Sequence, residues 1–301
     1  GMTNSVFQFE SSGMKGMLHD FKPDTIFDLI LLVAMYRPGP MQFLPDVIAV
    51  KNGRKQVSYL TPELEPILSA TYGSITYQEQ VQEIFKQLAG YSLGQADLVR
   101  RAMSKKKDAV LRAEREAFIH GDAERSIPGC IANGISLEAA NTLFDEMTDF
   151  AKYAFNKSHA ACYAVVAYQT AWLKCHYPKE YMKSVLNNTA FDKVPGLMKD
   201  LKLMKISSKA PDVNLSDLGF TLYNGEIVFG LGSIKGLGKS VTGVVEERKA
   251  HGAFRSLQDF VLRTGATKKI LEGFASAGAF DGFCKNRTAI MAVIPDYVKI
   301  G

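Results

Sequence analysis

A run of 15 residues without a charged side chain most constrains the fold of this chain. Residues 159–173 (HAACYAVVAYQTAWL) contain no Asp, Glu, Lys or Arg, and Pro178 follows soon after. The run predicts a helix that begins near Ser158 or His159, continues to about His176 and ends before Pro178. We expect one side of this helix to carry His159, Tyr163, Thr170 and Lys174, and the buried face to include Cys162, Val165, Gln169 and Trp172.

Polar side chains precede this run, because the segment that leads into it reads Asn156, Lys157, Ser158, His159. The first amides of a helix lack internal partners and carry the positive end of the helix dipole. Lys157 adds a full positive charge and Ser158 adds a hydroxyl donor, a combination that binds phosphate well. From these residues alone two interpretations stay open: a phosphate-binding site, or a capped core helix with an incidental lysine.

Composition sets the broad class of the chain. A hydrophobic content of 47% over 301 residues allows a packed core, excludes a mainly disordered chain and suggests two domains, or three small ones. The four cysteines are widely spaced, so we expect buried, reduced thiols rather than disulfides or a zinc site. No apolar run is long enough to cross a membrane and no secretory leader opens the sequence, so we expect a cytoplasmic protein without membrane contact.

Positive charge is concentrated rather than spread evenly. The net charge is only +5, yet the segment RRAMSKKK holds five cations in eight residues and no acid. These cations are Arg100, Arg101, Lys105, Lys106 and Lys107. A solvated helix face would explain such a run, but its density and its place after an apolar helix make anion binding a serious rival.

Helical patterns separated by turn signals run through most of the sequence, so we predict a mainly α fold. Asp24 or Thr25 can cap a helix that Pro38 stops, and Ser136 can cap a later amphipathic helix. Residues 108–119 are charged and rich in alanine, as on an exposed helix.

A small β element interrupts the helices. Asn224-Gly225 lies between two short runs of β-forming residues. Both positions of a type I′ turn need positive φ, which Asn and Gly tolerate best, so the pair predicts a two-residue hairpin.

Two glycines frame one apolar residue in the segment Lys235-Gly236-Leu237-Gly238-Lys239. Backbone amides in such a turn can approach a phosphate closely because no Cβ intervenes. The pattern indicates a helix-hairpin-helix contact with nucleic acid, and the alternative is a plain turn between helices. A second candidate surrounds Gly278.

Catalytic patterns are weak throughout. Ser158 and His159 are adjacent and no GxSxG motif is present, so a stand-alone hydrolase is the least favoured interpretation. The sequence contains no Asp-x-Asp pair of the kind that holds two Mg²⁺ ions for nucleotidyl transfer. The chain therefore presents phosphate-binding candidates without a metal site, which suggests half of an active site.

Several longer motifs together resemble a known family. They are VFQFESSGMKGML, LVAMYRPGPM, YGSITYQEQV, GYSLGQADLVRRAMSKKK, FAKYAFNKSHAACYAVVAYQTAWLKCHYPKEYM and FGLGSIKGLG followed by LEGFASAGAFDGF. In this order, and over nearly the whole chain, they resemble the alpha subunit of bacterial DNA polymerase III, the C-family replicative polymerase.

The resemblance implies a fragment with three parts. Residues 1–188 resemble the fingers, 189–218 a linker zone, and 219–301 a β-hairpin with tandem helix-hairpin-helix motifs. The palm with its catalytic aspartates and Mg²⁺ would lie upstream, so the resemblance implies no catalytic residue, metal or other cofactor in this chain. The fragment alone is then expected to be inactive, and a non-catalytic DNA-binding module is the alternative.

The resemblance also assigns roles to individual residues. The fingers of this family supply cations to the triphosphate of the incoming dNTP. This role falls on Arg100, Arg101, Lys105, Lys106, Lys107, Asn156, Lys157, Ser158 and His159, with Tyr163 near the base or sugar. Arg37, Gln78, Glu79 and Gln80 match family motifs as residues that could line the site. Residues 235–239 would contact the backbone of the primer-template, and the parent would bind a sliding clamp and other replisome subunits.

Two departures from the family pattern concern the same regions. Ser104 stands where many relatives have a glycine before the lysines, and Ala154 replaces a glycine just before the polar segment. Neither change removes a cation. Ala154 is expected to stiffen the turn that leads into residues 156–159.

Overall fold

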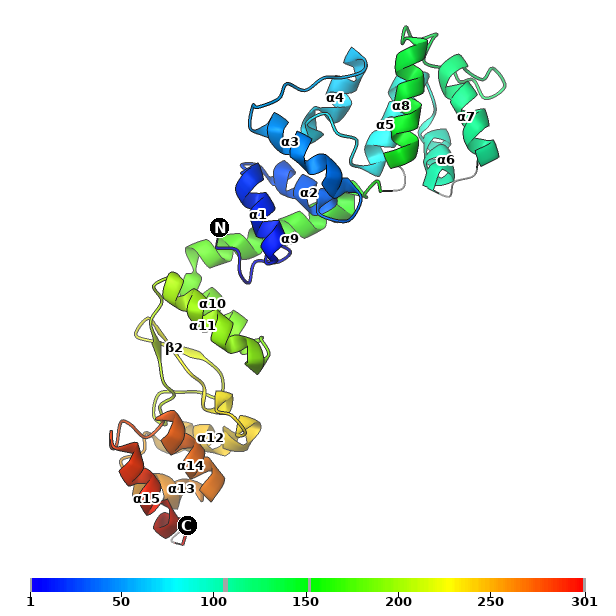
Figure 1. Cartoon of the computed structure of the whole chain (residues 1–301). Helices are drawn as coiled ribbons and strands as arrows, with labels where there is room; N and C mark the ends of the chain where they lie inside the picture. The colour runs from blue at the N-terminus through cyan, green and yellow to red at the C-terminus, as the bar shows by residue number, and fades with distance from the viewer. Residues whose placement is uncertain (1, 105–107, 151–152, 300–301) are drawn as a thin grey trace. The chain divides into compact units, whose positions relative to one another are not determined.

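The computed structural model describes residues 2–104, 108–150 and 153–299, and its fold is mainly α, as predicted (Figure 1). The chain divides into two compact units, Gly1–Ala171 and Trp172–Gly301. The functional boundaries at 188/189 and 218/219 remain a prediction.

The first unit is helical. Its α-helices are α1 (Ser12–Phe21), α2 (Ile26–Met35), α3 (Leu44–Lys51), α4 (Glu65–Leu68), α5 (Gln78–Ala89), α6 (Leu93–Ser104), α7 (Asp108–His120), α8 (Leu137–Phe150) and the greater part of α9 (Lys157–His176). Short 3₁₀ turns are η1 (Pro40–Phe43), η2 (Pro62–Leu64) and η3 (Ser69–Thr71).

Two apolar cores hold this unit together. Helices α5 to α8 pack around Phe85, whose ring lies 4.9 Å from that of Phe118 and 6.2 Å from that of Phe144. Helices α1 to α3 pack with α9 around Phe21 and Leu31, which are fully buried. Aromatic rings at such separations add packing energy beyond their buried area.

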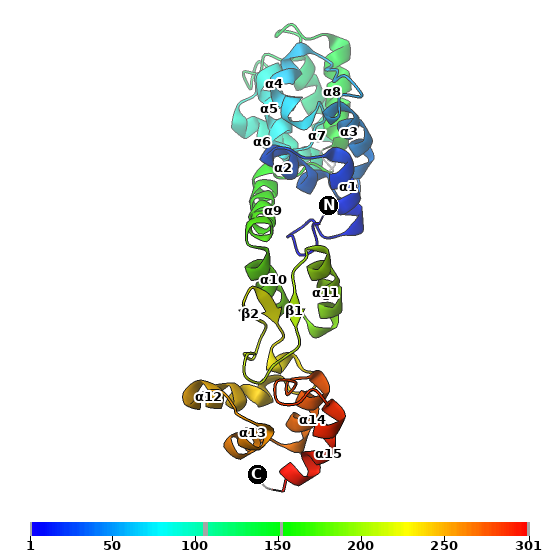
Figure 2. The ribbon, with the colours of Figure 1, turned by 90° about the vertical axis from the view of Figure 1, so that its left-hand side faces the viewer.

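The second unit joins helices to a small sheet. It contains α10 (Pro178–Asn187), η4 (Phe191–Lys193), α11 (Val194–Leu203), β1 (Ser208–Lys209), β2 (Thr221–Tyr223), β3 (Glu226–Val228), η5 (Leu231–Ser233), η6 (Gly238–Val241), α12 (Thr242–His251), α13 (Leu257–Thr264), α14 (Lys268–Ala277) and α15 (Arg287–Tyr297). In the sheet β3 is central, parallel to β1 and antiparallel to β2, and α10 packs against β2 and β3 (Figure 2). Residues 189–218, the predicted linker zone, therefore include a helix and a strand.

The predicted helix caps and the predicted hairpin turn are confirmed, because each depends on interactions between residues close in the sequence. The Thr25 hydroxyl accepts the Asp28 N–H at 3.2 Å, and that of Ser136 accepts the Ala139 N–H at 3.1 Å. Asn224 and Gly225 have φ of 49° and 79°, as a type I′ turn requires. Helix α9 begins at Lys157 and ends at His176, close to the predicted bounds.

The predicted buried face of α9 is wrong. Cys162, Val165, Gln169 and Trp172 are all exposed, and the buried residues of α9 are Ala160, Ala164, Ala167 and, near its end, Lys174. Small side chains at this spacing let α9 approach its neighbours closely, so the larger apolar residues face outward.

Two other expectations about burial also fail. Helix α7 is not exposed along its whole length, because Phe118 and Ile119 at its end belong to the core. Of the four cysteines, all free thiols, only Cys130 is buried. In both cases the type of residue was read correctly from the sequence, but tertiary packing determines which of these residues are buried.

Candidate functional site

The start of α9 is held against the start of α5 by a backbone bridge. The Phe155 N–H donates to the Thr76 carbonyl at 3.0 Å, and the Gln78 N–H donates to the Phe155 carbonyl at 2.9 Å. The Gln78 side chain adds a bond to the Ala154 carbonyl at 3.2 Å. The motif YQEQ and the segment that precedes α9 therefore form one structural element.

Glu79 caps α9 from α5. Its carboxylate oxygens accept the Lys157 N–H at 3.0 and 3.1 Å, and one of them accepts the Asn156 side-chain amide at 3.0 Å. The Asn156 side-chain oxygen in turn accepts the His159 N–H at 2.8 Å. A carboxylate thus already occupies a position in which the helix dipole favours an anion. A phosphate could reach the Lys157 amide only by displacing Glu79.

The Lys157 ammonium remains available for an anion. Its Nζ lies 5.5 Å from the centre of the Tyr77 ring, and in the part of the chain that the structure describes no carboxylate lies within 4 Å of it. Tyr77 is buried, so its ring is a rigid support for the lysine stem. Of the two groups, the amide of Lys157 is occupied by Glu79, whereas its side chain is exposed.

Aromatic rings continue from this lysine along α9. The His159 ring lies 5.4 Å from that of Phe155 and 4.4 Å from that of Tyr163, and Tyr163 lies 5.3 Å from Phe7. His159 is exposed and Tyr163 is half-buried. Flat faces next to a cation suit a ligand that has both a negative group and an aromatic ring.

Arg37 stabilises the segment that leads into α9. Its Nε donates to the Ala34 carbonyl at 2.8 Å, its terminal nitrogen donates to the Tyr153 carbonyl, and its guanidinium lies 4.5 Å from the centre of the Phe155 ring. Burial holds the pKa of Arg37 below its usual value. With these contacts the residue positions the chain around 153–155.

Gln80 is a buried structural residue rather than an open part of the site. Its side-chain oxygen accepts the N–H groups of Thr76 and Tyr77 at 2.8 and 2.9 Å, and its nitrogen donates to Thr71 at 2.7 Å and to Ile67 at 3.2 Å. All of its strong hydrogen-bonding capacity is therefore used to hold the turn before α5.

The second group of cations lies on α6. One carboxylate, that of Asp97, pairs with Arg100 at 2.8 Å and with Arg101 at 2.7 Å. The hydrogen bond from Arg100 is the main cause that holds the pKa of Asp97 below its usual range. A single carboxylate is thus shared by the two guanidinium groups. Lys105, Lys106 and Lys107 lie outside the described residues.

Helix α5 connects the two groups of cations. Glu79 binds the start of α9, and Gln82, three residues later, donates to Asp97 at 2.8 Å. Residues three apart on a helix are neighbours on one face, so this face of α5 contacts both groups. Gln82 and Asp97 were absent from the candidates drawn from the sequence. The available signal was Asp97, which precedes two arginines at helical spacings of three and four residues.

The glycine turn of the second unit has the geometry expected of a phosphate contact. Gly236 and Gly238 both have positive φ, 83° and 50°, and Leu237 between them is buried in the core of α12 to α15. Gly273 permits this, since a Cβ there would lie 2.9 Å from Leu237. A hollow of about 390 Å³, lined by residues 232–238 and Phe191, lies over the turn.

Three exposed lysines surround this turn. Lys235 and Lys239 flank it, and Lys269 of α14 lies beside Gly236. In the described part of the chain none of the three has a carboxylate within 4 Å. At Gly278, the second candidate, the neighbouring Arg287 is instead paired with Asp281 at 2.6 Å. The turn at 236–238 is therefore the stronger candidate for anion binding.

The described residues contain neither a metal-binding cluster nor a membrane-spanning helix. Within them no three His, Cys, Asp or Glu side chains gather as a metal site would require. Over the same residues no helix is both long and apolar enough to span a membrane. The site of the first unit is thus a set of cations and aromatic rings.

Two family models and many known proteins match this chain. Residues 1–126 match the family described as "Bacterial DNA polymerase III alpha subunit finger domain", and residues 205–290 match "Helix-hairpin-helix motif". The chain is 43% identical to DNA polymerase III subunit alpha of Xylella fastidiosa over 306 residues, 99% of this chain and 25% of that protein. The proteins of the same name from Pseudomonas aeruginosa and Thermus aquaticus are 46% and 43% identical, over 93% and 94% of this chain and 24% and 23% of theirs. The chain spans about a quarter of the length of these relatives.

Proposed function

The chain belongs to the family of bacterial DNA polymerase III alpha subunits, and on that premise we propose that it is the fingers and helix-hairpin-helix part of a replicative DNA polymerase. The parent enzyme would transfer a nucleotide from dNTP to the 3′ end of a primer. The single observation that carries this proposal is the exposed Lys157 ammonium beside Tyr77, which has no ion-pair partner among the described residues. Its helix start is bonded to α5, and Gln82 of α5 donates to Asp97, the acid that pairs with the arginines of α6.

The fingers act in this proposal through charge and position. During transfer the primer hydroxyl attacks the α-phosphorus and pyrophosphate leaves, so negative charge grows on the phosphate oxygens. Lys157 and Arg101 stabilise that charge, with Ser158 as a further donor, and Asn156 holds the turn that presents Lys157. Lys105 to Lys107 would extend the same basic segment. The ring of Tyr163, which lies 4.4 Å from that of His159, supports the base or sugar.

Metal chemistry would come from outside this part of the enzyme. Mg²⁺ held by the palm of the parent would polarise the phosphate and activate the primer hydroxyl. The described residues offer no cluster of ligands for it. We therefore propose that this chain has no polymerase activity in isolation.

The second unit contacts the backbone of duplex DNA. The amides of Gly236 and Gly238 approach a phosphate, and Lys235, Lys239 and Lys269 surround it with positive charge. Such contacts fix the position of the protein on DNA without reading its sequence. The same proposal places the end of the fingers at residue 188 and a linker at 189–218. It also includes contacts of the parent enzyme, in the cytoplasm, with a sliding clamp and other replisome subunits.

The test is Lys157→Ala in the complete polymerase. We expect kcat/KM for dNTP to fall by about a hundredfold, as for the loss of one preorganised group at the transition state, while the affinity for primer-template stays within twofold of wild type. Lys86→Ala is the matched control, since Lys86 is exposed on α5 and pairs with Glu83. If Lys157→Ala incorporated nucleotides at the wild-type rate, Lys157 would have no role in binding the triphosphate and would contribute only to the packing of α9.

A further inference from the structure

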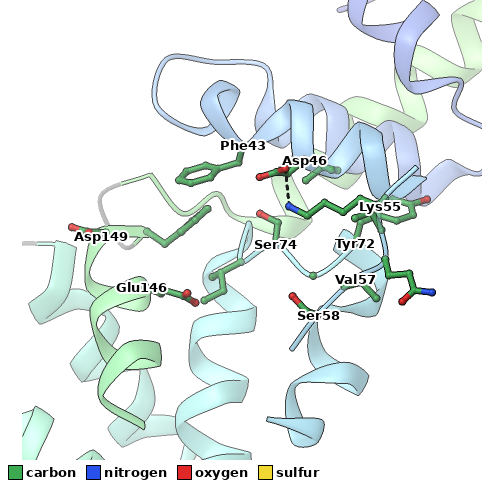
Figure 3. Close-up of a pocket in the computed structure, with 15 residues that line it drawn as sticks. Phe43, Asp46, Lys55, Val57, Ser58, Tyr72, Ser74, Glu146 and Asp149 are labelled. Carbon is green, nitrogen blue, oxygen red and sulfur yellow. Dashed lines mark hydrogen bonds and ion pairs between the residues drawn. The ribbon is translucent and has the colours of Figure 1, made fainter. Parts of the chain in front are cut away.

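A separate cavity of about 400 Å³ lies in the first unit (Figure 3), and its lining includes neither Lys157 nor the arginines of α6. It is formed by α3, the segment 55–58, the segment 72–75 and the end of α8. Its volume falls within the range of pockets that bind small molecules. Nothing in the proposed polymerase function uses it.

Apolar side chains form part of the wall of this cavity. The rings of Phe43 and Phe150 lie 4.8 Å apart, centre to centre, at one side. Val47, Val57 and Ile75 add aliphatic surface. Such walls favour an apolar or aromatic body, because burying that body removes its surface from water.

The polar groups of the cavity favour a cation. Its lysine, Lys55, is already neutralised by Asp46 at 2.8 Å, as Figure 3 shows. Glu146 of α8 also lines the cavity, and among the described residues it has no hydrogen-bond or ion-pair partner. Burial raises the pKa of this carboxyl. A carboxylate that lacks a partner next to apolar walls is stabilised by a positive group.

We propose that this cavity binds a small organic cation whose ammonium or guanidinium group pairs with Glu146 and whose apolar body packs against Phe43 and Phe150. An anion would be repelled by Glu146, and a purely apolar molecule would leave the carboxylate without a partner. The proposal does not depend on the polymerase function.

The cavity lies beside the segments that lead to the start of α9. Residues 72–75 continue directly into the bridge at Tyr77, and Phe150 ends the helix that precedes Phe155 on the other side of the same bridge. A bound cation would therefore contact both segments that lead to the start of α9.

The test compares three probes of equal shape on the 301-residue chain: 3-phenylpropylamine, 3-phenylpropanol and 3-phenylpropanoate. Binding is measured by calorimetry and by ligand-observed NMR. We expect the amine to bind about fivefold more tightly than the alcohol, the gain of one partly exposed ion pair, and the carboxylate to bind least.

Two variants and one control locate the site. Glu146→Gln should remove the preference for the amine, whereas Glu138→Gln, an exposed acid on the same helix, should keep it. Val57→Phe should narrow the cavity and weaken the binding of all three probes, and melting curves verify that each variant is folded. The proposal is overturned by equal binding of amine and alcohol, by no binding of the amine, or by an amine preference that survives in Glu146→Gln.

Discussion

Glu79 caps α9 by accepting the backbone N–H of Lys157 on both of its carboxylate oxygens, at 3.0 and 3.1 Å. The acid on α5 thereby fixes where the lysine begins its helix. The same acid places a negative charge close to the proposed triphosphate site. Glu79 therefore both orients the start of α9 and repels the proposed triphosphate. An uncharged replacement that still accepts a hydrogen bond would remove the repulsion and keep the orientation.

Glu79→Gln in the complete polymerase should lower KM for dNTP by about thirtyfold, because the repulsion between two like charges on the order of 8 Å apart near a surface is worth about 2 kcal/mol, and the substitution removes it. The glutamine oxygen can still accept the Lys157 N–H, so α9 keeps its start. Steady-state kinetics over a dNTP series measures the effect. Glu83→Gln, one turn later on α5, is the control, and a KM that rises in Glu79→Gln would contradict the proposed position of the triphosphate.

Lys239→Ala should weaken the binding of duplex DNA and reduce the slope of log K against log salt by about 0.9, the contribution of one phosphate contact. Fluorescence anisotropy of the chain with labelled duplex at several salt concentrations gives that slope. Lys202→Ala is the matched control, because Lys202 is exposed on α11 of the same unit and does not line the hollow over the glycine turn. Equal slopes for both variants would remove the turn from the DNA interface.

The stability of the first unit should fall in acid because of Asp28. Burial would raise the pKa of this carboxyl, but hydrogen bonds from Tyr72 at 2.7 Å, from the Asp24 N–H and from Lys51 at 3.0 Å outweigh burial and hold the pKa well below its usual 3.8. A depressed pKa contributes stability that is complete above the unfolded value and is lost as the pH falls below it.

The free energy of unfolding should accordingly decrease from about pH 4 to about pH 2. Urea titrations across that range measure it. Asp28→Asn should flatten the dependence and Tyr72→Phe should reduce it, whereas Asp20→Asn, an exposed acid, should leave it unchanged. A wild-type slope in Asp28→Asn would assign the acid sensitivity to other carboxyl groups.

Ala164→Leu should destabilise the first unit by about 1–3 kcal/mol through overpacking. Ala164 is completely buried where α9 meets the core of α1 to α3. The next residue provides the control: Val165 is 44% exposed, so Val165→Ala should change the free energy of unfolding by no more than about 0.5 kcal/mol. Similar losses in both variants would contradict the face of α9 described above.

The isolated chain should show no primer extension with Mg²⁺ and all four dNTPs, because its described residues hold no metal-binding cluster. Gel analysis of a labelled primer-template measures this, with the complete polymerase as positive control. Metal-dependent extension by the purified chain would refute the assignment of catalysis to a missing palm.

Interactions between near neighbours in the sequence were predictable. Thr25 and Ser136 cap their helices, Asn224-Gly225 turns a hairpin, and α9 spans almost the predicted residues. Each depends on groups within a few residues, whose geometry the local backbone sets. The cationic segments could be located for the same reason, since a lysine carries its charge in any fold.

Packing between distant segments was not predictable in this way. Small alanines, not Val165 or Cys162, turned out to be the buried face of α9, because the spacing of apolar residues does not reveal which side a neighbour covers. The cap from Glu79 to Lys157 joins residues 78 positions apart. The chain specifies its helices, turns and charges through short-range contacts, whereas the pairing of those charges and the choice of buried faces arise only when separate helices compete for the same core.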